Sequence, residues 1–249
     1  KKIIFIENLK KMLKRQEYKY FISQNEIHIL RRSLKKFMKI DENSNKINSS
    51  YTVTSLYFDT PYESNFNEKV DGIISREKFR IRKYSTSDII KFESKKKNEN
   101  VILKQSEKID VNYSEKIING NYDFFDKKIS KFLKHSFVKL RSNCYKAKNI
   151  VEYDREAYYL PYGNIRITFD TNLRTYNSDV NFNKISNSSI SLLPNELNIL
   201  EVKFSLPLPE HLKNILSKTI ATRSAISKFV FGQKYVNFSP WSDNITEPF

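Results

Sequence analysis

Glycine, cysteine and histidine are scarce in this sequence, and each absence excludes a kind of site. There are 4 glycines in 249 residues, and neither G-x-G-x-x-G nor G-x-x-x-x-G-K-[ST] occurs, which excludes the usual glycine-rich phosphate loops. The single cysteine, Cys144, excludes an internal disulfide, and with 3 histidines the chain gives little support to zinc fingers or cysteine–histidine catalysis. No run of about 18 apolar residues occurs, so we predict no membrane span in this segment.

Positive charge and aromatic residues are abundant instead. The formal net charge of +16 favours a polyanionic partner, such as nucleic acid, an anionic membrane surface or a phosphate polymer. Lysine is enriched together with asparagine and isoleucine, a general bias that inflates the charge, so the positions of the cations matter more than their sum. With 39% hydrophobic and 14% aromatic residues, the chain is apolar enough for a real core. We predict a single domain over 1–249.

The stretch 76–84 has the clearest strand pattern in the chain. Side chains alternate between the two faces of a strand, so Phe79 and Ile81 share one face while Arg80 and Arg82 share the other. A strand that buries the phenylalanine face must present both guanidinium groups together on the opposite face. Guanidinium forks match phosphate oxygens in bidentate fashion, so this face favours an anionic ligand.

Hydrophobic spacing predicts strands separated by helices and polar loops. Ser23 suits a helix N-cap with Glu26 as its capping-box partner, and Ile27, Leu30 and Leu34 follow at helical spacing. We predict strands over 17–22, 51–59, 73–84, 88–97, 101–109, 150–160, 164–170 and 197–204. We predict helices over 1–15, from Ser23 to before the loop 41–50, within 114–148, and over 209–220 and 223–231, with a loop over 171–195 and a tail over 239–249.

Charged residues recur on one face of nearly every predicted strand. An ordinary antiparallel sheet with one solvated face also alternates in this way. This face, however, repeats arginine and lysine, with Glu17, Glu93 and Glu201 among them. About eight strands can close into a barrel that holds one ligand, and clustered like charges need a balancing anion or metal. We therefore predict an α+β fold, a closed antiparallel β-barrel of about eight strands with flanking helices and a basic interior.

A series of short motifs resembles one known family. Their order along the chain resembles that of the VTC domain. This is the catalytic domain of the vacuolar transporter chaperone polyphosphate polymerase and its bacterial relatives, and it belongs to the triphosphate tunnel metalloenzyme superfamily. The resemblance covers about residues 15–235, and the order makes it specific, although each motif alone is weak. The motifs are Glu17-Tyr-Lys-Tyr, Ser55-Leu-Tyr-Phe-Asp-Thr, Lys78-Phe-Arg-Ile-Arg-Lys-Tyr, Phe92-Glu-Ser-Lys, Glu152-Tyr-Asp-Arg-Glu-Ala-Tyr, Arg166-Ile-Thr-Phe-Asp, Leu200-Glu-Val-Lys-Phe and Ser227-Lys-Phe.

This resemblance implies roles for individual residues. Glu201 matches the glutamate that holds a divalent metal, manganese or magnesium. Lys228 matches a lysine that closes over the phosphates, and Tyr153 matches the tyrosine two residues before a phosphate-binding arginine. The residues that match bases gripping the nucleotide triphosphate and the growing chain are Lys19, Arg80, Arg82, Lys95, Arg155 and Arg166. We predict further substrate contacts from Arg15, Lys97, Lys104, Lys203 and Ser227.

Two positions depart from the family patterns. The hydrolytic branch of the superfamily carries Glu-x-Glu-x-Lys on its first strand, and Arg15 replaces the first glutamate here while Glu17 and Lys19 remain. This replacement favours the polymerase branch. Lys97 stands where the eukaryotic pattern has histidine. Glu201 also has a simpler interpretation, neutralisation of Lys203, and Glu17 is equally compatible with an ion pair and with a metal ligand.

Three functions are compatible with these features. The resemblance implies transfer of the γ-phosphoryl group of ATP to a polyphosphate chain, with ATP and polyphosphate as partners and Mn²⁺ or Mg²⁺ as cofactor. The first alternative is a metal-dependent triphosphatase with the same tunnel, and the second is a polyphosphate- or nucleic-acid-binding module without catalysis. We expect no nucleic acid as a partner, because the lysine and arginine side chains are not accompanied by exposed aromatic rings on which nucleobases could stack. We expect a cytoplasmic location, or the cytoplasmic face of a membrane if flanking segments anchor the chain.

Overall fold

The computed structural model describes residues 15–41, 44, 49–99, 101–122, 129–176, 181–183, 185, 189–194, 196–219 and 221–237. The predicted helix over 1–15 lies outside these residues except for Arg15, as does the predicted tail over 239–249. The strands are β1 (Gln16–Ser23), β2 (Lys39–Ile40), β3 (Ser50–Asp59), β4 (Arg76–Tyr84), β5 (Ser87–Asn98), β6 (Val101–Ile109), β7 (Lys146–Leu160), β8 (Ile165–Thr175), β9 (Ile190–Ser191) and β10 (Leu197–Phe204). The helices are α2 (Gln24–Leu34), α3 (Ser64–Val70), α4 (Val111–Ile118), α5 (Lys131–Ser142), α6 (Glu210–Leu216) and α7 (Lys228–Asn237), with the short 3₁₀ helix η1 (Tyr162–Asn164).

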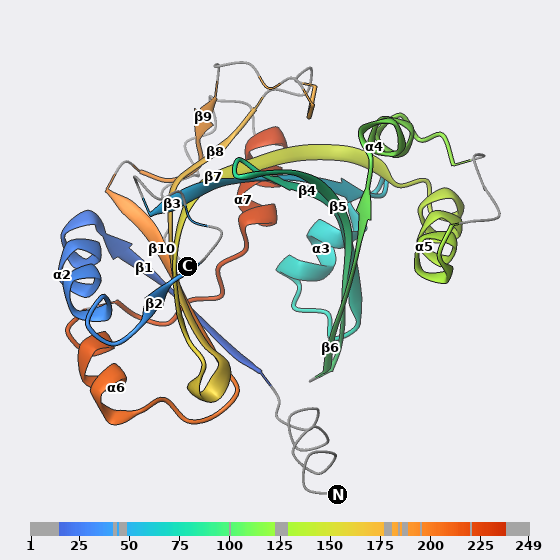
Figure 1. The fold of residues 1–249 in the computed structure, drawn as a ribbon. Coiled ribbons are helices and arrows are strands. Elements are labelled where there is room, and N and C mark those ends of the chain that lie inside the picture. The colour runs from blue at the N-terminus through green and yellow to red at the C-terminus, as the bar shows by residue number, and fades with distance from the viewer. Residues whose placement is uncertain are drawn as a thin grey trace, which may run out of the picture.

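The strands form one curved sheet in the order β1-β10-β8-β7-β3-β4-β5-β6, with β2 on β7 and β9 on β8. Every ladder between the described strands is antiparallel, which confirms the predicted antiparallel α+β architecture. The sheet bends into an arch (Figure 1). Its two ends, β1 and β6, share no ladder in the described part of the chain, so the closed barrel is not confirmed.

Two apolar clusters cover the convex face of the sheet. On the β4–β5 side, Phe79 and Phe92 pack with Phe137 of α5 and Ile117 of α4. On the β1–β10–β8 side, helices α2 and α6 pack on the sheet, and the cluster includes Ile27, Leu30, Ile167, Val202 and Leu212. Helix α2 begins at the predicted capping box, in which the Ser23 side chain accepts from the Glu26 N–H and the Glu26 carboxylate accepts from the Ser23 N–H. These clusters fix which side chains of each strand are left for the concave face.

Helices α3 and α7 lie on the concave side of the arch (Figure 1). Phe229 of α7 packs on Tyr57 of β3, with ring centroids 5.2 Å apart. Gly232 allows α7 to approach β7 closely, because a Cβ built there would lie 2.7 Å from Cγ2 of Val151. Helix α7 is therefore positioned to place its first residue, Lys228, beside the charged strands.

All eight predicted strands are present, and the main differences concern helices. Helix α3 was not predicted, because 60–63 has the composition of a turn; its N-terminus is held by the Asp59 carboxylate, which accepts from the N–H groups of Asn65 and Phe66. The prediction of a last helix over 223–231 was wrong in its bounds, since α7 covers Lys228–Asn237. Strand β7 begins at Lys146 and β8 continues to Thr175, so both are longer than predicted. No helix among the described residues is long and apolar enough to cross a membrane.

Candidate functional site

One wall of the concave face is built by β4, β5 and β6 around a buried carboxylate, Glu93. Arg80 Nε donates to Glu93 Oε2 at 2.7 Å, and Arg80 Nη1 donates to the Tyr57 hydroxyl at 3.3 Å. Lys104 Nζ lies 2.8 Å from Glu93 Oε1, and Arg82 Nη1 lies 3.9 Å from Glu93 Oε2. Burial alone would raise the pKa of Glu93, but the three cations bring the pKa below its usual range. Glu93 therefore stays ionised and holds both arginines toward the concave side.

The opposite wall centres on Arg155 of β7. Its guanidinium group donates to both Asp170 oxygens of β8, at 2.6 and 2.7 Å, and its Nη2 also donates to Glu201 Oε2 of β10 at 3.2 Å. Lys228 Nζ lies 2.6 Å from Asp170 Oδ2, and Lys203 Nζ lies 2.8 Å from Glu201 Oε1. Two buried carboxylates thus share one guanidinium group, and each has a lysine of its own.

Tyr153 joins the two walls. Its hydroxyl, on β7, accepts a hydrogen bond from Nη2 of Arg82 on β4 at 3.5 Å. Its ring lies 5.1 Å from the Arg155 guanidinium carbon and 4.8 Å from Lys228 Nζ. Both distances are within the range of cation–π attraction. The tyrosine is fully buried and orients cations from both sides of the arch toward one region.

Residues of β1 link the two ends of the sheet. Glu17 Oε1 lies 3.1 Å from Lys19 Nζ on the same strand, and Glu17 Oε2 lies 3.8 Å from Lys95 Nζ on β5. Lys19 Nζ also donates to the carbonyl oxygen of Ile226, just before α7. Strands β1 and β5 are far apart in the ladder order, so the Glu17–Lys95 contact brings one end of the arch within side-chain reach of the strand next to its other end.

The site carries more positive than negative charge. Burial alone would raise the pKa of Glu201, but Lys203, Lys19, Lys228 and Arg155 bring the pKa well below its usual range. Burial lowers the pKa of Lys203 to about 8, against the opposing effect of Glu201. The cations Lys19, Arg80, Arg82, Lys95, Lys104, Arg155, Lys203 and Lys228 outnumber the carboxylates Glu17, Glu93, Asp170 and Glu201 by eight to four. The concave face is therefore suited to a ligand with several negative charges.

The donor set near Glu201 fits a divalent metal that arrives with its substrate. The described residues contain no group of three or more histidine, cysteine, aspartate or glutamate residues that could hold a metal alone. Magnesium usually takes one or two protein carboxylates and completes its shell with water and substrate phosphates. Glu201 and Asp170 supply such a pair. Thr168, paired opposite Glu201 in the β8–β10 ladder, has a buried hydroxyl with no hydrogen-bond partner among the described residues.

Four of the predicted site residues lie outside the central group of contacts. Arg166 is engaged elsewhere: its Nη2 lies 2.6 Å from Asp41 Oδ2 and donates to the Tyr51 hydroxyl at 3.0 Å. Lys97 lies at the end of β5, opposite Arg76. Arg15 is exposed before β1, and Ser227 precedes α7. The remaining predicted residues, Lys19, Arg80, Arg82, Lys95, Lys104, Tyr153, Arg155, Glu201, Lys203 and Lys228, are brought together on the concave face.

Sequence reasoning did not assign roles to several residues of the site. Glu93 and Asp170 belong to the alternating charged pattern, so period-two spacing could have indicated both. Thr168 lies between Arg166 and Asp170 at the same period-two spacing, which places it on the charged face without assigning it a role. Tyr57 carries no such signal, because tyrosine is common on either face of a strand. Lys78 lies on the same face as Arg80 but has an aromatic neighbour in place of a carboxylate, with its Nζ 4.0 Å from the centre of the Phe229 ring.

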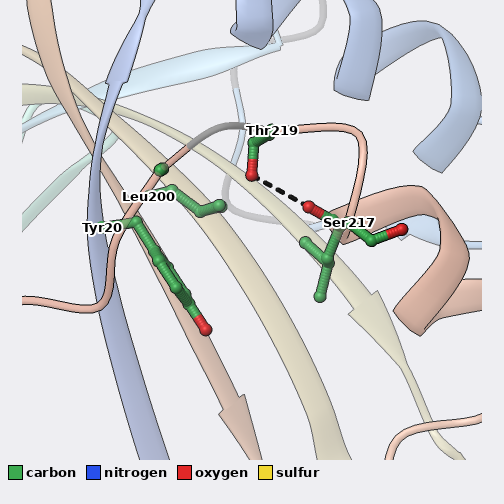
Figure 2. Close-up of a pocket in the computed structure, with 6 residues that line it drawn as sticks. Tyr20, Leu200, Ser217 and Thr219 are labelled. Carbon is green, nitrogen blue, oxygen red and sulfur yellow. Dashed lines mark hydrogen bonds between the residues drawn. The ribbon is translucent and has the colours of Figure 1, made fainter.

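A separate cavity of about 240 Å³, lined by both apolar and hydroxyl-bearing side chains, lies on the convex side of the sheet. Figure 2 shows Tyr20 of β1 and Leu200 of β10 on one side of it and Ser217 and Thr219 after α6 on the other. Thr219 Oγ1 donates to the carbonyl oxygen of Leu216 at 2.9 Å, so this hydroxyl is already engaged. None of the described residues that line the cavity is charged, and the cavity is not part of the concave site.

Comparisons with known proteins bear on the family and on the fold. The family model of the VTC domain matches residues 14–237. A solved structure from Hippeastrum, an adenylyl cyclase candidate described as having a dominant triphosphatase activity, is similar with a TM-score of 0.52 and 14% identity, over 88% of this chain and 94% of that chain. An adenylate cyclase candidate from Bacillus halodurans has a TM-score of 0.44 and 13% identity, over 82% of this chain and 88% of that chain. No curated protein matches the sequence. At these identities, the Hippeastrum structure supports the fold alone.

Proposed function

The chain belongs to the VTC domain family, and from this premise we propose that it is an ATP-dependent polyphosphate polymerase. The observation that carries the proposal is the convergence of Lys19, Arg82, Arg155, Lys203 and Lys228 from different strands and one helix onto a single concave face. Such a surface supplies many phosphate contacts and few apolar ones. Because the reaction would need ATP as its phosphoryl donor, it would take place in the cytoplasm.

The reaction requires positioning and charge stabilisation rather than covalent catalysis. A terminal oxygen of the polyphosphate chain attacks the γ-phosphorus of ATP; a new P–O bond forms, the bond between the γ-phosphorus and the bridging oxygen breaks, and ADP leaves with that oxygen. The attacking phosphate oxygen is already ionised, so no protein base is needed. Arg80, Arg82 and Arg155 would hold the phosphates in line and stabilise the charge that develops on their oxygens.

A divalent metal would be held by Glu201, with Asp170 and the Thr168 hydroxyl beside it. When bound, such an ion neutralises charge on phosphate oxygens and orients the transferred group. The residues of the chain then keep the phosphates in place. Lys228, at the start of α7, contacts Asp170 and would close over the phosphates from the helix side.

Substitution of residues on each wall tests the proposal. We expect Arg82→Ala and Glu201→Gln each to lower kcat/KM for polyphosphate synthesis by about 100-fold or more, because each removes a charged group that contacts the transferred phosphate or its metal. Circular dichroism and thermal melting should show that both variants remain folded. The matched control is Arg32→Ala on α2, an exposed arginine on the convex side. Full activity of Glu201→Gln would overturn the assigned metal position, and full activity of both variants would overturn the site.

A further inference from the structure

Helix α7 meets the sheet through one row of residues. Phe229, Gly232 and Gln233 are spaced by three and four positions, so they share a face of the helix, and this face lies on β3 and β7. Phe229 packs on the Tyr57 ring, and Gly232 contributes no side chain. Apolar packing of this kind is not directional. The member of the row that makes directional contacts, and so fixes how the helix is turned, is Gln233.

The buried side chain of Gln233 has hydrogen-bond partners on two other parts of the chain. Its Oε1 accepts from Asn149 Nδ2 of β7 at 2.8 Å, and its Nε2 donates to Glu63 Oε1 at 2.9 Å. An ionised carboxylate only accepts hydrogen bonds, so Glu63 determines that the NH₂ end of Gln233 faces it. The oxygen of Gln233 is then turned toward Asn149, which must present its own NH₂ group. One carboxylate thus orients two buried amides in series.

Glu63 contacts α7 although it stands at the start of α3. It occupies the N-cap position of α3 with a φ of +54°, and its side chain makes no capping hydrogen bond to that helix. A residue other than glycine is strained at such a φ. Its Oε1 also lies 3.8 Å from Lys148 Nζ of β7. The carboxylate is therefore held between α7 and β7 instead of completing its own helix.

The contacts of Asn149 show that this arrangement is not the most stable one available. Its Oδ1 is buried and has no hydrogen-bond partner among the described residues. An unsatisfied buried polar atom destabilises a fold, whereas an apolar pair of similar shape leaves no such atom. In some proteins, buried polar groups select one arrangement of elements at the expense of stability. Asn149, Gln233 and Glu63 are suited to this task for α7.

The placement of α7 decides where its first residue, Lys228, lies. Lys228 Nζ is 2.6 Å from Asp170 Oδ2 and 4.8 Å from the centre of the Tyr153 ring, in the middle of the candidate site. A slip of the helix by one residue would turn it by about 100° and shift it by about 1.5 Å. Either change would take Lys228 away from Asp170.

We propose that Gln233 is a positioning residue, which holds α7 through Asn149 and Glu63 so that Lys228 reaches the bound phosphates. The inference rests on the proposed function, from which Lys228 takes its role, and it adds the residues that place this lysine. Phe229 supplies apolar packing to the same helix, and Gln233 selects its rotation. Loss of the two amides should therefore weaken phosphate binding without weakening the fold.

A double-mutant cycle on triphosphate binding tests this role, because a purely structural residue does not couple to Lys228. The test variant, Asn149→Leu/Gln233→Met, removes both amides together and leaves neither without its partner. We expect its melting temperature to stay unchanged or rise. Its Kd for inorganic triphosphate, measured by calorimetry, should rise about tenfold as Lys228 loses its place. In a Lys228→Ala background, the same two changes should alter the Kd by less than about twofold.

The matched control is Gln24→Met/Asn198→Leu, which makes the same two substitutions at another amide pair. There, Asn198 Nδ2 of β10 donates to Gln24 Oε1 of α2 at 3.4 Å. The pair lies where α2 begins, on the convex side of the sheet, and contacts no residue of α7. We expect the control to bind triphosphate as the unaltered protein does.

Glu63→Gly is a second variant, which keeps the test valid if the double substitution unfolds the protein. Glycine relieves the strain at a φ of +54° and removes the carboxylate that orients Gln233. We expect the Kd for triphosphate to rise by about threefold, with no fall in melting temperature. Combined with Lys228→Ala, the effect of Glu63→Gly should disappear.

Three results would overturn the positioning role. An unchanged Kd in the test variant and in Glu63→Gly would mean that packing alone places α7. Equal weakening with and without Lys228, together with a lower melting temperature, would assign Gln233 to the fold alone. An unchanged Kd in Lys228→Ala would leave α7 with no phosphate contact to place.

Assaying the unaltered protein with ATP separates this role from the proposed function. Polymer formation without coupling between Gln233 and Lys228 would overturn the positioning role alone. Coupling in triphosphate binding without polymer formation would overturn the polymerase and leave the positioning role standing. If the unaltered protein binds no triphosphate, both proposals fail.

Discussion

Individual residues of the site differ in whether their polar groups are satisfied by the protein. Arg155 donates through Nε and Nη2, with both Asp170 oxygens and one Glu201 oxygen as acceptors. The Thr168 hydroxyl is buried beside them, and no described residue forms a hydrogen bond with it. Buried polar atoms without partners are costly, and in native proteins they often mark a place where a ligand, ion or water binds. The two residues are thus expected to respond to substitution in opposite ways.

Thr168→Val tests the unsatisfied hydroxyl. Valine keeps the shape of threonine and removes the buried oxygen, so the free energy of unfolding should be unchanged or rise by about 1 kcal/mol. We expect the concentration of Mn²⁺ or Mg²⁺ needed for half-maximal activity to rise, because a group near the metal is lost. Thermal melting and a metal titration of activity measure the two effects. Lower stability together with an unchanged metal requirement would show that the hydroxyl serves the fold.

Lys78 should give the site a dependence on pH near neutrality. Burial, together with the nearby charges of Arg76 and Lys69, lowers its pKa to about 7. Between pH 7 and the ordinary lysine value, the unfolded chain holds a proton that the folded chain lacks, so Lys78 makes the folded state more stable as pH rises. Anion binding needs the charged form and should weaken over the same range. The charged groups that face Lys78 are Asp59, Glu68, Lys69, Arg76 and Lys95.

Lys78→Arg provides the test of this dependence. Arginine remains charged at every pH used, because its pKa exceeds 12. We compare the Kd for polyphosphate of the unaltered protein with that of Lys78→Arg. Between pH 7 and 8.5, we expect the ratio of the first Kd to the second to rise by up to about tenfold per pH unit. Comparing the two proteins at each pH cancels the titration of other groups, including the phosphates. Parallel pH profiles would rule out Lys78 as the titrating group.

The secondary structure elements were predictable where one face is uniformly apolar. The alternation of apolar Phe79 and Ile81 with Arg80 and Arg82 was enough to assign both faces of β4. The Ser23–Glu26 capping box located the start of α2. Helix α3 could not be predicted from local composition, because its N-terminus is held by the Asp59 side chain instead of a local cap. The pairing of Arg155 with Asp170 depends on the register of β7 against β8, which period-two spacing does not specify.

Helix α7 connects packing to the charged site through Gly232. A Cβ at this position would lie 2.7 Å from Cγ2 of Val151, a stiff and fully buried side chain. Overpacking costs about 1–3 kcal/mol, against a gain in helix propensity of about 1 kcal/mol. We expect Gly232→Ala to lower the free energy of unfolding by about 1 kcal/mol and to lower activity several-fold, because the shift of α7 moves Lys228 away from Asp170.

Gly120→Ala is the control for this effect. Gly120 has a φ of +72°, so alanine there is strained by about 1–2 kcal/mol, although nothing lies within 4 Å of the new Cβ. Gly120 follows α4, on the convex side of the sheet. Both variants should lose stability, but only Gly232→Ala should lose activity at a temperature where both are folded. An equal loss of activity would attribute the effect to stability alone.

At the scale of the whole molecule, the sheet forms an arch whose ends approach through side chains. The sequence predicted a closed barrel, but the ladder order ends at β1 and β6 without pairing between them in the described residues. The Glu17–Lys95 contact links β1 to β5 across the concave side. Strand closure depends on backbone hydrogen bonds between strands distant in sequence, which alternation of side chains does not specify. The excess of positive charge on the concave face, in contrast, follows directly from the alternation.

The central claim is that this concave face joins phosphates into a polymer. The most direct measurement incubates the unaltered protein with ATP labelled at the γ-phosphate and with Mn²⁺ or Mg²⁺, and then separates the products by gel electrophoresis and by a free-phosphate assay. We predict that most of the label enters a ladder of polyphosphate chains, that little appears as free phosphate, and that a chelator stops the reaction. Label found in free phosphate alone would contradict the account and identify a triphosphatase with water as the acceptor.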